Sequence, residues 1–307
     1  MPGKVRHPLV ERDERAAGPH AEEGKDQPDS MEEDIPPGQL FERGHLGTDH
    51  IPCYSEPPMD RITFDGSHLA VQFDAPPSGS LCILYLHGFG SVQTGEKAEF
   101  FRQKALETGF AFCSFDFQGH GQSGGTMQGL TLSRNLQDVE RVHAHVREKG
   151  YERVILLGSS MGGGTAIWYS ALHPEEILAG LHIAPALQLE RGLTTWAGPE
   201  RCRTWQETGT IHFENDLVSC ELGWELIEDL RRHAFEDLLQ RYRTPALLLQ
   251  GKLDTSVPWK DVAEFATRCA HPGIELHLFG DGDHRLTDRK DRLWGLMMEF
   301  LKGKALI

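Results

Sequence analysis

Apolar runs that alternate with amphipathic helical patterns constrain this 307-residue chain more than any other feature. Six segments are predicted strands, and those at 81–86, 110–115 and 154–157 are apolar runs, which is typical of strands covered on both faces. The six segments span residues 81–86, 110–115, 154–157, 177–183, 245–250 and 274–279. Helical patterns fall between and after them, at 96–108, 131–148, 161–172, from Pro258 to Cys269 and from Leu293 to Leu301. This alternation predicts an α/β fold with a mostly parallel central sheet and helices on both faces.

Two segments depart from the alternating pattern. Residues 1–58 contain nine of the 17 prolines, 13 Asp and Glu, and only eight Val, Ile, Leu and Phe. Such a segment buries too little apolar area to offset chain entropy, so we expect a mostly disordered acidic tail. The domain proper is then 59–307, and it opens with a hairpin around Asp65-Gly66. An aromatic, polar and partly helical insert at about 185–243 is too long for a simple connection, and we expect a lid over the strand ends.

Charge and hydropathy exclude several classes of partner. The net charge of −15 argues against nucleic acid and anionic membranes, since both require a basic patch. No stretch approaches the roughly 18 apolar residues of a membrane span. The N-terminus shows no secretory h-region, and its arginines are mixed with acids, unlike a transit peptide. The expected location is the cytoplasm, and the expected partner is a small molecule.

The strongest chemical signal is Gly158-Ser159-Ser160-Met161-Gly162, which follows a predicted strand and opens a predicted helix. This is the G-x-S-x-G nucleophile elbow in the context it requires. A serine on so sharp a turn has strained backbone angles, and glycines at 158 and 162 remove the clashes that larger residues would cause. The hydroxyl of Ser160 then projects above the sheet, with a helix N-terminus beneath it.

A serine hydroxyl needs a base, and in this arrangement an acid and then a histidine follow the serine along the chain. Asp254 comes directly after the strand that ends at Gln250, and His284 follows the last predicted strand. We therefore expect a Ser160, Asp254 and His284 triad. Asp281 or Asp283 is an alternative acid, although their closeness to His284 in sequence makes the required geometry awkward.

Acyl transfer also needs donors for the developing oxyanion. The backbone N–H of Met161 is one candidate, and that of Phe89, in the glycine-containing loop 87–90 after the first buried strand, is the other. His87 in the same loop is expected to be a structural hydrogen-bonding residue.

Other motifs in the chain favour structural roles. Gly119, Gly121 and Gly124 match G-x-G-x-x-G, but the next helix starts only near Thr131, so we expect a tight turn anchored by Asp116. His143 and His145 do not share a helix face, so a metal site is not expected there. No cofactor or metal is predicted. Among the cysteines, Cys202 and Cys220 would be the first pair to test for a disulfide, although the even number of cysteines is weak evidence for one. The tryptophans of the insert either line an acyl pocket or form the core of the lid.

Together these residues resemble the α/β-hydrolase superfamily over about residues 60–303. The order of motifs, with Trp205-Gln-Glu-Thr-Gly209 in the insert, is similar to mitochondrial acyl-protein thioesterases and acyl-glucuronide esterases, and to bacterial cinnamoyl and feruloyl esterases. The acidic tail departs from the thioesterase group, whose members would carry a transit peptide in its place. The resemblance implies a serine hydrolase of carboxylic esters or thioesters that uses the triad and the two N–H groups above. A peptidase or amidase on the same triad, and a silent hydrolase fold that binds a partner, are the alternatives.

Overall fold

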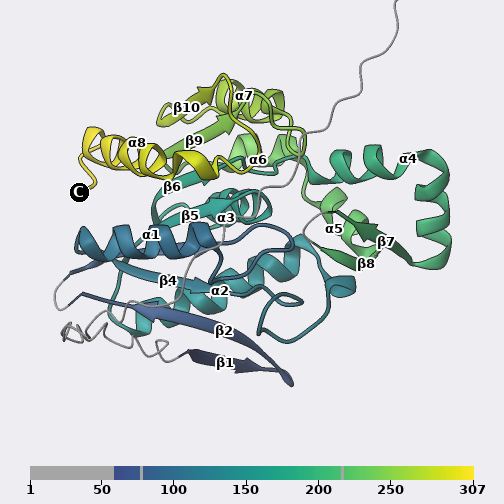
Figure 1. Ribbon diagram of the computed structural model, residues 1–307, viewed down its shortest axis with the longest axis horizontal. Helices are drawn as coiled ribbons and strands as arrows, with labels where there is room; N and C mark the ends of the chain where they lie inside the picture. Colours follow the sequence, from purple (N-terminus) through teal and green to yellow (C-terminus); the bar gives the residue numbers. More distant parts are fainter. Residues whose placement is uncertain (1–58, 77–78, 216–217) are drawn as a thin grey trace, which may run out of the picture. The chain divides into compact units, whose positions relative to one another are not determined.

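The computed structural model describes residues 59–76, 79–215 and 218–307. The predicted acidic tail, residues 1–58, lies outside the described residues, as does Cys53. The described part is an eight-stranded sheet with helices on both sides, together with a small separate hairpin (Figure 1). The predicted α/β class is therefore confirmed.

The sheet has the strand order β1-β2-β4-β3-β5-β6-β9-β10. From β4 to β10 all neighbouring strands run parallel, whereas β2 pairs antiparallel with both β1 and β4. The strands are β1 (Asp60–Phe64), β2 (Ser67–Asp74), β3 (Leu81–Leu86), β4 (Ala111–Phe115), β5 (Arg153–Ser159), β6 (Ile177–Ile183), β9 (Ala246–Gly251) and β10 (Ile274–Phe279). The six predicted central strands are thus all present. Asp65 and Gly66 both have positive φ, 42° and 76°, in the predicted β1–β2 hairpin.

Two helical layers explain why the central strands are apolar throughout. Alternate residues of β3 point to opposite sides: Leu84 packs with the helices of one layer, and Ile83 and Tyr85 pack with those of the other. The first layer contains α2 (Leu132–Glu148), α3 (Met161–Leu172) and α7 (Trp259–Arg268). The second contains α1 (Glu96–Glu107) and α8 (Lys290–Gly303). One predicted boundary moves: Pro258 has an extended ψ of 123° and precedes α7 instead of opening it.

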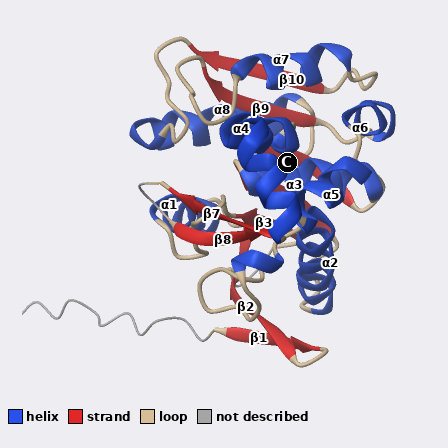
Figure 2. Ribbon diagram, turned by 90° about the vertical axis from the view of Figure 1, so that its right-hand side faces the viewer, coloured by secondary structure: helices blue, strands red, loops and turns tan. Residues whose placement is uncertain are grey.

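The insert between β6 and β9 folds into helices and the separate hairpin. Its elements are α4 (Leu189–Thr208), β7 (Thr210–Glu214), β8 (Ser219–Gly223), α5 (Glu225–Arg232) and α6 (Phe235–Arg241). Gly198, with φ 72°, kinks α4 just before Pro199. In Figure 1 most of these elements gather at the right of the sheet, and Figure 2, seen from that side, places α4, β7 and β8 toward the viewer.

The core of the insert contains two of its tryptophans. Trp205 is fully buried, and its indole N–H donates to the Leu222 carbonyl oxygen at 2.9 Å. Its ring meets that of Trp224 edge-on, with centroids 5.4 Å apart. Trp205 and Trp224 therefore belong to the core of the insert, whereas Trp196 is exposed, and none of the three lines the cavity described below.

The described cysteines are all free thiols, so Cys202 and Cys220 do not form a disulfide. Cys82 and Cys113 are buried in β3 and β4 as expected. Within the described residues, no helix combines the length and the apolar character that a membrane span needs.

Candidate active site

Ser160 lies at the junction of β5 and α3 in a backbone conformation that few residues other than glycine adopt, with φ 54° and ψ −118°. The glycines around it leave no room for side chains. A Cβ on Gly158 would come within 2.6 Å of the Gly162 carbonyl oxygen, and a Cβ on Gly162 would overlap the carbonyl oxygen of Leu86. The turn therefore packs directly against β3 and holds the partly exposed Ser160 at the carboxyl end of the sheet.

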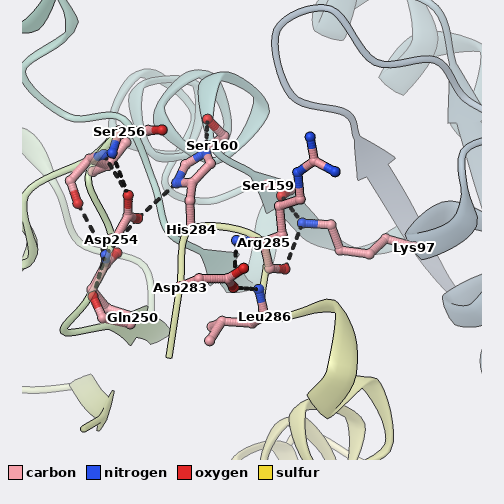
Figure 3. Close-up of polar contacts among 12 residues, drawn as sticks. Lys97, Ser159, Ser160, Gln250, Asp254, Ser256, Asp283, His284, Arg285 and Leu286 are labelled. Carbon is pink, nitrogen blue, oxygen red and sulfur yellow. Dashed lines mark hydrogen bonds and ion pairs between the residues drawn. The ribbon is translucent and has the colours of Figure 1, made fainter. Parts of the chain in front are cut away.

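The three side chains that the sequence singled out come together although they are far apart in the chain (Figure 3). His284 Nε2 lies 3.0 Å from Ser160 Oγ, and His284 Nδ1 lies 2.7 Å from Asp254 Oδ2. A carboxylate only accepts hydrogen bonds, so Nδ1 carries the proton and Nε2 is free to accept from the serine hydroxyl. This is the arrangement in which a histidine can act as a base toward Ser160.

Asp254 is held in place by a full set of donors. Its side chain is fully buried, Oδ1 accepts from the N–H groups of Ser256 and Val257 at 2.8 Å each, and Oδ2 accepts from Gln250 Nε2 at 2.9 Å. Burial by itself would raise the pKa of Asp254, but the hydrogen bond and charge of His284, with the Val257 and Gln250 donors, lower the pKa below its ordinary value. The group stays ionised beside the imidazole.

The alternative acids have other partners. Asp283 accepts from the N–H groups of Arg285 and Leu286 at 3.0 and 2.7 Å, which shapes the loop that carries His284. Asp281 is exposed and pairs with Arg289. Asp254 is therefore the carboxylate that contacts His284.

The backbone N–H groups of Phe89 and Met161 have no acceptor among the described residues. Met161 is the first residue of α3, so its N–H belongs to an uncapped helix N-terminus. The loop that carries Phe89 lies close to the serine, since a Cβ on Gly88 would be 3.3 Å from Ser160 Cβ. Both N–H groups therefore lie in segments that adjoin Ser160 and have no described acceptor, and their role as oxyanion donors stays a prediction.

The neighbouring polar residues have structural roles. His87 is fully buried, with Nδ1 2.8 Å from the Gly88 carbonyl oxygen and Nε2 accepting from Phe117 N–H at 3.1 Å. Burial, with the nearby charge of His120, lowers the pKa of His87 to about 3, so the ring is neutral. Asp116 accepts from the N–H groups of Gln93 and Gln122, at 2.7 and 2.9 Å, which anchors the predicted glycine-rich turn.

The two histidines of α2 hydrogen-bond different residues. His143 contacts the Tyr169 hydroxyl at 3.0 Å, and His145 contacts Asp60 at 3.0 Å. Over the part of the chain that the structure describes, no group of three or more His, Cys, Asp or Glu side chains forms a metal site.

One residue at the site gave no sequence signal. The Lys97 ammonium, from α1, donates to Ser159 Oγ at 2.9 Å and to the Arg285 carbonyl oxygen at 3.1 Å (Figure 3). It therefore joins the residue before Ser160 to the residue after His284. Burial, the largest influence, lowers the pKa of Lys97 to about 8. A lysine in an amphipathic helix is ordinary in sequence, so nothing in residues 96–108 distinguished it.

A cavity of about 220 Å³ lies between α2, α3 and the insert, and Met161 forms part of its wall. Much of its wall is apolar and comes from the N-terminal part of α2, from α3 and from α5 and α6. The apolar lining includes Leu130, Leu132, Met161, Trp168, Leu187, Leu226, Leu230 and Phe235. The cavity therefore offers an apolar space next to the residue that follows Ser160.

Comparison with known proteins shows what the chain is similar to. Residues 77–209 match a hydrolase family model described as serine aminopeptidase, S33. The mouse palmitoyl-protein thioesterase ABHD10, a mitochondrial protein, is 28% identical over 216 residues, which cover 68% of this chain and 70% of the mouse protein.

Solved structures agree with the family match. A putative hydrolase from Agrobacterium vitis S4 has a TM-score of 0.68 at 26% identity, covering 79% of this chain and 99% of that one. The Butyrivibrio proteoclasticus enzyme Est1E with bound ferulic acid has a TM-score of 0.64 at 21% identity, covering 79% of this chain and 99% of its own, and shows the shared fold. The chain has the fold of the α/β-hydrolases, and its sequence and structure are similar to serine hydrolases of that superfamily.

Proposed function

We propose that the protein hydrolyses carboxylic ester or thioester bonds through an acyl-enzyme on Ser160. The observation that carries this proposal is the chain of contacts from Asp254 through His284 to Ser160, at 2.7 and 3.0 Å. A thioesterase and several esterases among its relatives and fold neighbours support the choice of bond.

The proposed reaction has two halves. Ser160 Oγ attacks the acyl carbon and its proton passes to His284 Nε2, while the N–H groups of Phe89 and Met161 donate to the oxyanion. The tetrahedral intermediate then expels the alcohol or thiol, which takes the proton from His284. Water next attacks the acyl-enzyme and gives a proton to His284, and the acid leaves as Ser160 is restored. Asp254 orients the imidazole and stabilises its cation in both halves. No metal or organic cofactor takes part in these steps.

The size of the cavity beside Met161 suits a small acyl group. A dry apolar cavity of about 150 Å³ accommodates benzene, so the 220 Å³ here corresponds to a phenyl ring with a short linker or a chain of several carbons. The whole of a long fatty acyl chain would exceed it.

An aminopeptidase is the second candidate, because the matching family model carries that description. Such an enzyme must hold the positively charged amino terminus of a peptide, usually on a carboxylate. The carboxylate that lines the cavity, Glu190, is already paired with Arg231 at 3.1 Å. Ester or thioester hydrolysis is therefore the better fit. The cytoplasmic location stays a prediction, and the thioesterase relatives are named as mitochondrial.

The test compares the wild type with Ser160→Ala on p-nitrophenyl butyrate, the corresponding thioester and an alanine p-nitroanilide, alongside labelling by a fluorophosphonate probe. We expect ester and thioester turnover that disappears in the variant, and probe labelling of Ser160. A folded variant with turnover within tenfold of wild type, or faster cleavage of the anilide than of the esters, contradicts the proposal. A wild type that neither turns over nor takes the probe would instead indicate a silent binding protein.

A further inference from the structure

We propose that the cavity beside Met161 binds acyl groups that carry a neutral polar substituent, such as a hydroxyl, which hydrogen-bonds the amide of Asn135. This inference rests on the proposed function, because it specifies the substrate class of that same site. It makes Asn135 a specificity-determining residue.

Asn135 is the exceptional polar residue of the cavity wall. It lies in the N-terminal part of α2 and is only 3% exposed. Its Oδ1 is buried without a hydrogen-bond partner, and its side-chain nitrogen also has none among the described residues. A buried amide oxygen without a partner is unfavourable, so native structures rarely keep one that nothing uses.

The other charged, hydroxyl, amide and imidazole side chains of the lining already have partners. Thr165 donates to the Met161 carbonyl oxygen at 3.0 Å, and His233 contacts the Asp229 carbonyl oxygen at 2.9 Å. The remaining pairs are Gln188 with Glu264, Glu190 with Arg231, and Arg191 with Asp261. A bound group therefore meets one unsatisfied amide in a wall whose other charged, hydroxyl, amide and imidazole side chains have partners.

The donor and acceptor groups of the Asn135 amide determine which acyl substituent is complementary to the cavity. The carbonyl oxygen of Asn135 accepts and its NH₂ group donates, so a hydroxyl, which does both, is complementary in either orientation of the amide. A charged acyl group is disfavoured, because the arginines at this cavity, Arg191 and Arg231, are already neutralised by acids. A plain hydrocarbon fills the space but leaves the amide unpaired.

The enzyme should therefore discriminate between acyl groups that carry a hydroxyl and those that are plain hydrocarbon. A site built to hydrogen-bond a substrate hydroxyl rejects the analogue that lacks it more strongly than an apolar pocket rejects an added methylene. Because the cavity suits a ring with a short linker, the informative substrates are aryl-alkanoyl esters with and without a hydroxyl on the ring.

The experiment measures kcat/KM for p-nitrophenyl esters of phenylacetate, 3-phenylpropanoate and 4-phenylbutanoate, each against its 4-hydroxyphenyl analogue. The three linker lengths scan the position of the hydroxyl. In the wild type we expect at least one pair to favour the hydroxylated ester by about tenfold or more. Asn135→Leu, which is close to Asn in shape, should lose most of that preference, and Asn135→Ala provides a second variant.

Ser170→Ala is the matched control, because Ser170 is also buried, on α3, but donates to the Ala166 carbonyl oxygen at 2.8 Å and does not line the cavity. Its hydroxyl preference should equal that of wild type. Ester turnover with a preference below twofold in every pair overturns the inference alone, as does an unchanged preference in folded Asn135 variants. No turnover of any ester overturns the inference and the proposed function together.

Discussion

The Lys97 ammonium donates to the hydroxyl of Ser159 at 2.9 Å and so links α1 to the turn that carries Ser160. Its second hydrogen bond, at 3.1 Å, goes to the Arg285 carbonyl oxygen beside His284. One side chain thus spans the two segments that must stay in register for the Ser160–His284 contact. The contact between α1 and the elbow joins residues 62 positions apart in the chain.

Replacing Lys97 by methionine should lower activity. Loss of both hydrogen bonds frees the His284 loop, and a hydrogen bond from a charged group is worth about 1.5–3 kcal/mol, so we expect kcat/KM to fall about tenfold or more. Lys290→Met is the control, because Lys290 pairs with Glu96 next in sequence to Lys97 but contacts neither loop. Equal activity of both variants would contradict the positioning role.

The same variant should change the pH dependence of stability. Burial lowers the pKa of Lys97 from 10.5 to about 8. Between these pH values the unfolded chain binds a proton that the folded chain does not, so this residue makes the fold more stable as pH rises from about 8 toward 10.5. Lys97→Met lacks that contribution. The Tm of wild type minus that of Lys97→Met should therefore increase across this range, and a constant difference would contradict the lowered pKa.

Asp254→Asn should abolish most activity while the fold persists. The substitution removes the charge that stabilises the imidazolium and the acceptor that holds the Nδ1 proton, and in a serine protease triad the equivalent change lowers kcat about 10⁴-fold. The control is Asp283→Asn, since that side chain keeps an oxygen to accept from Arg285 and Leu286 N–H. Steady-state kinetics on one ester checks both. A larger loss for Asp283→Asn would reverse the assignment of the acid.

The elements that could be predicted from sequence are those whose environment is reflected in their composition. Strands such as β3 and β5 are covered on both faces, so they appear as apolar runs. Asp254 and His284 were found because a parallel sheet brings the loops after its strands to one edge. Gly158 and Gly162 were found because a close backbone approach excludes a Cβ.

The features that escaped sequence analysis depend on single contacts between distant segments. Lys97 and Asn135 each occupy an unremarkable position in an amphipathic helix, and their importance comes from what faces them in space. The tryptophans of the insert were ambiguous for a similar reason, because an indole suits a lid core as well as a pocket wall. The hydrogen bond from Trp205 to Leu222 shows that Trp205 belongs to the core of the insert.

Gly162→Ala should destabilise the protein through overpacking. The added methyl would overlap the Leu86 carbonyl oxygen, and such overpacking typically costs about 1–3 kcal/mol in the free energy of unfolding. Gly192→Ala is a matched control, because a Cβ at Gly192, in α4, meets nothing within 4 Å. That helical glycine should gain up to about 1 kcal/mol on substitution. Urea unfolding measures both, and equal stability of the two variants would contradict the tight contact between the elbow and β3.

Trp205→Phe should weaken the insert and, through it, the cavity. The change removes the indole donor and leaves the Leu222 carbonyl oxygen buried without its partner, which costs about 1–3 kcal/mol. In a domain of this size each kcal/mol lowers Tm by about 2–4 °C. Leu226 and Leu230 of α5, which line the cavity, follow Leu222 closely in the chain, so KM for aryl-alkanoyl esters should rise as well.

Trp196→Phe is the control for this prediction. Trp196 is 39% exposed, and its replacement should change the free energy of unfolding by less than about 0.5 kcal/mol. If Trp205→Phe behaved like Trp196→Phe in both measurements, the buried hydrogen bond would have no role in holding the insert.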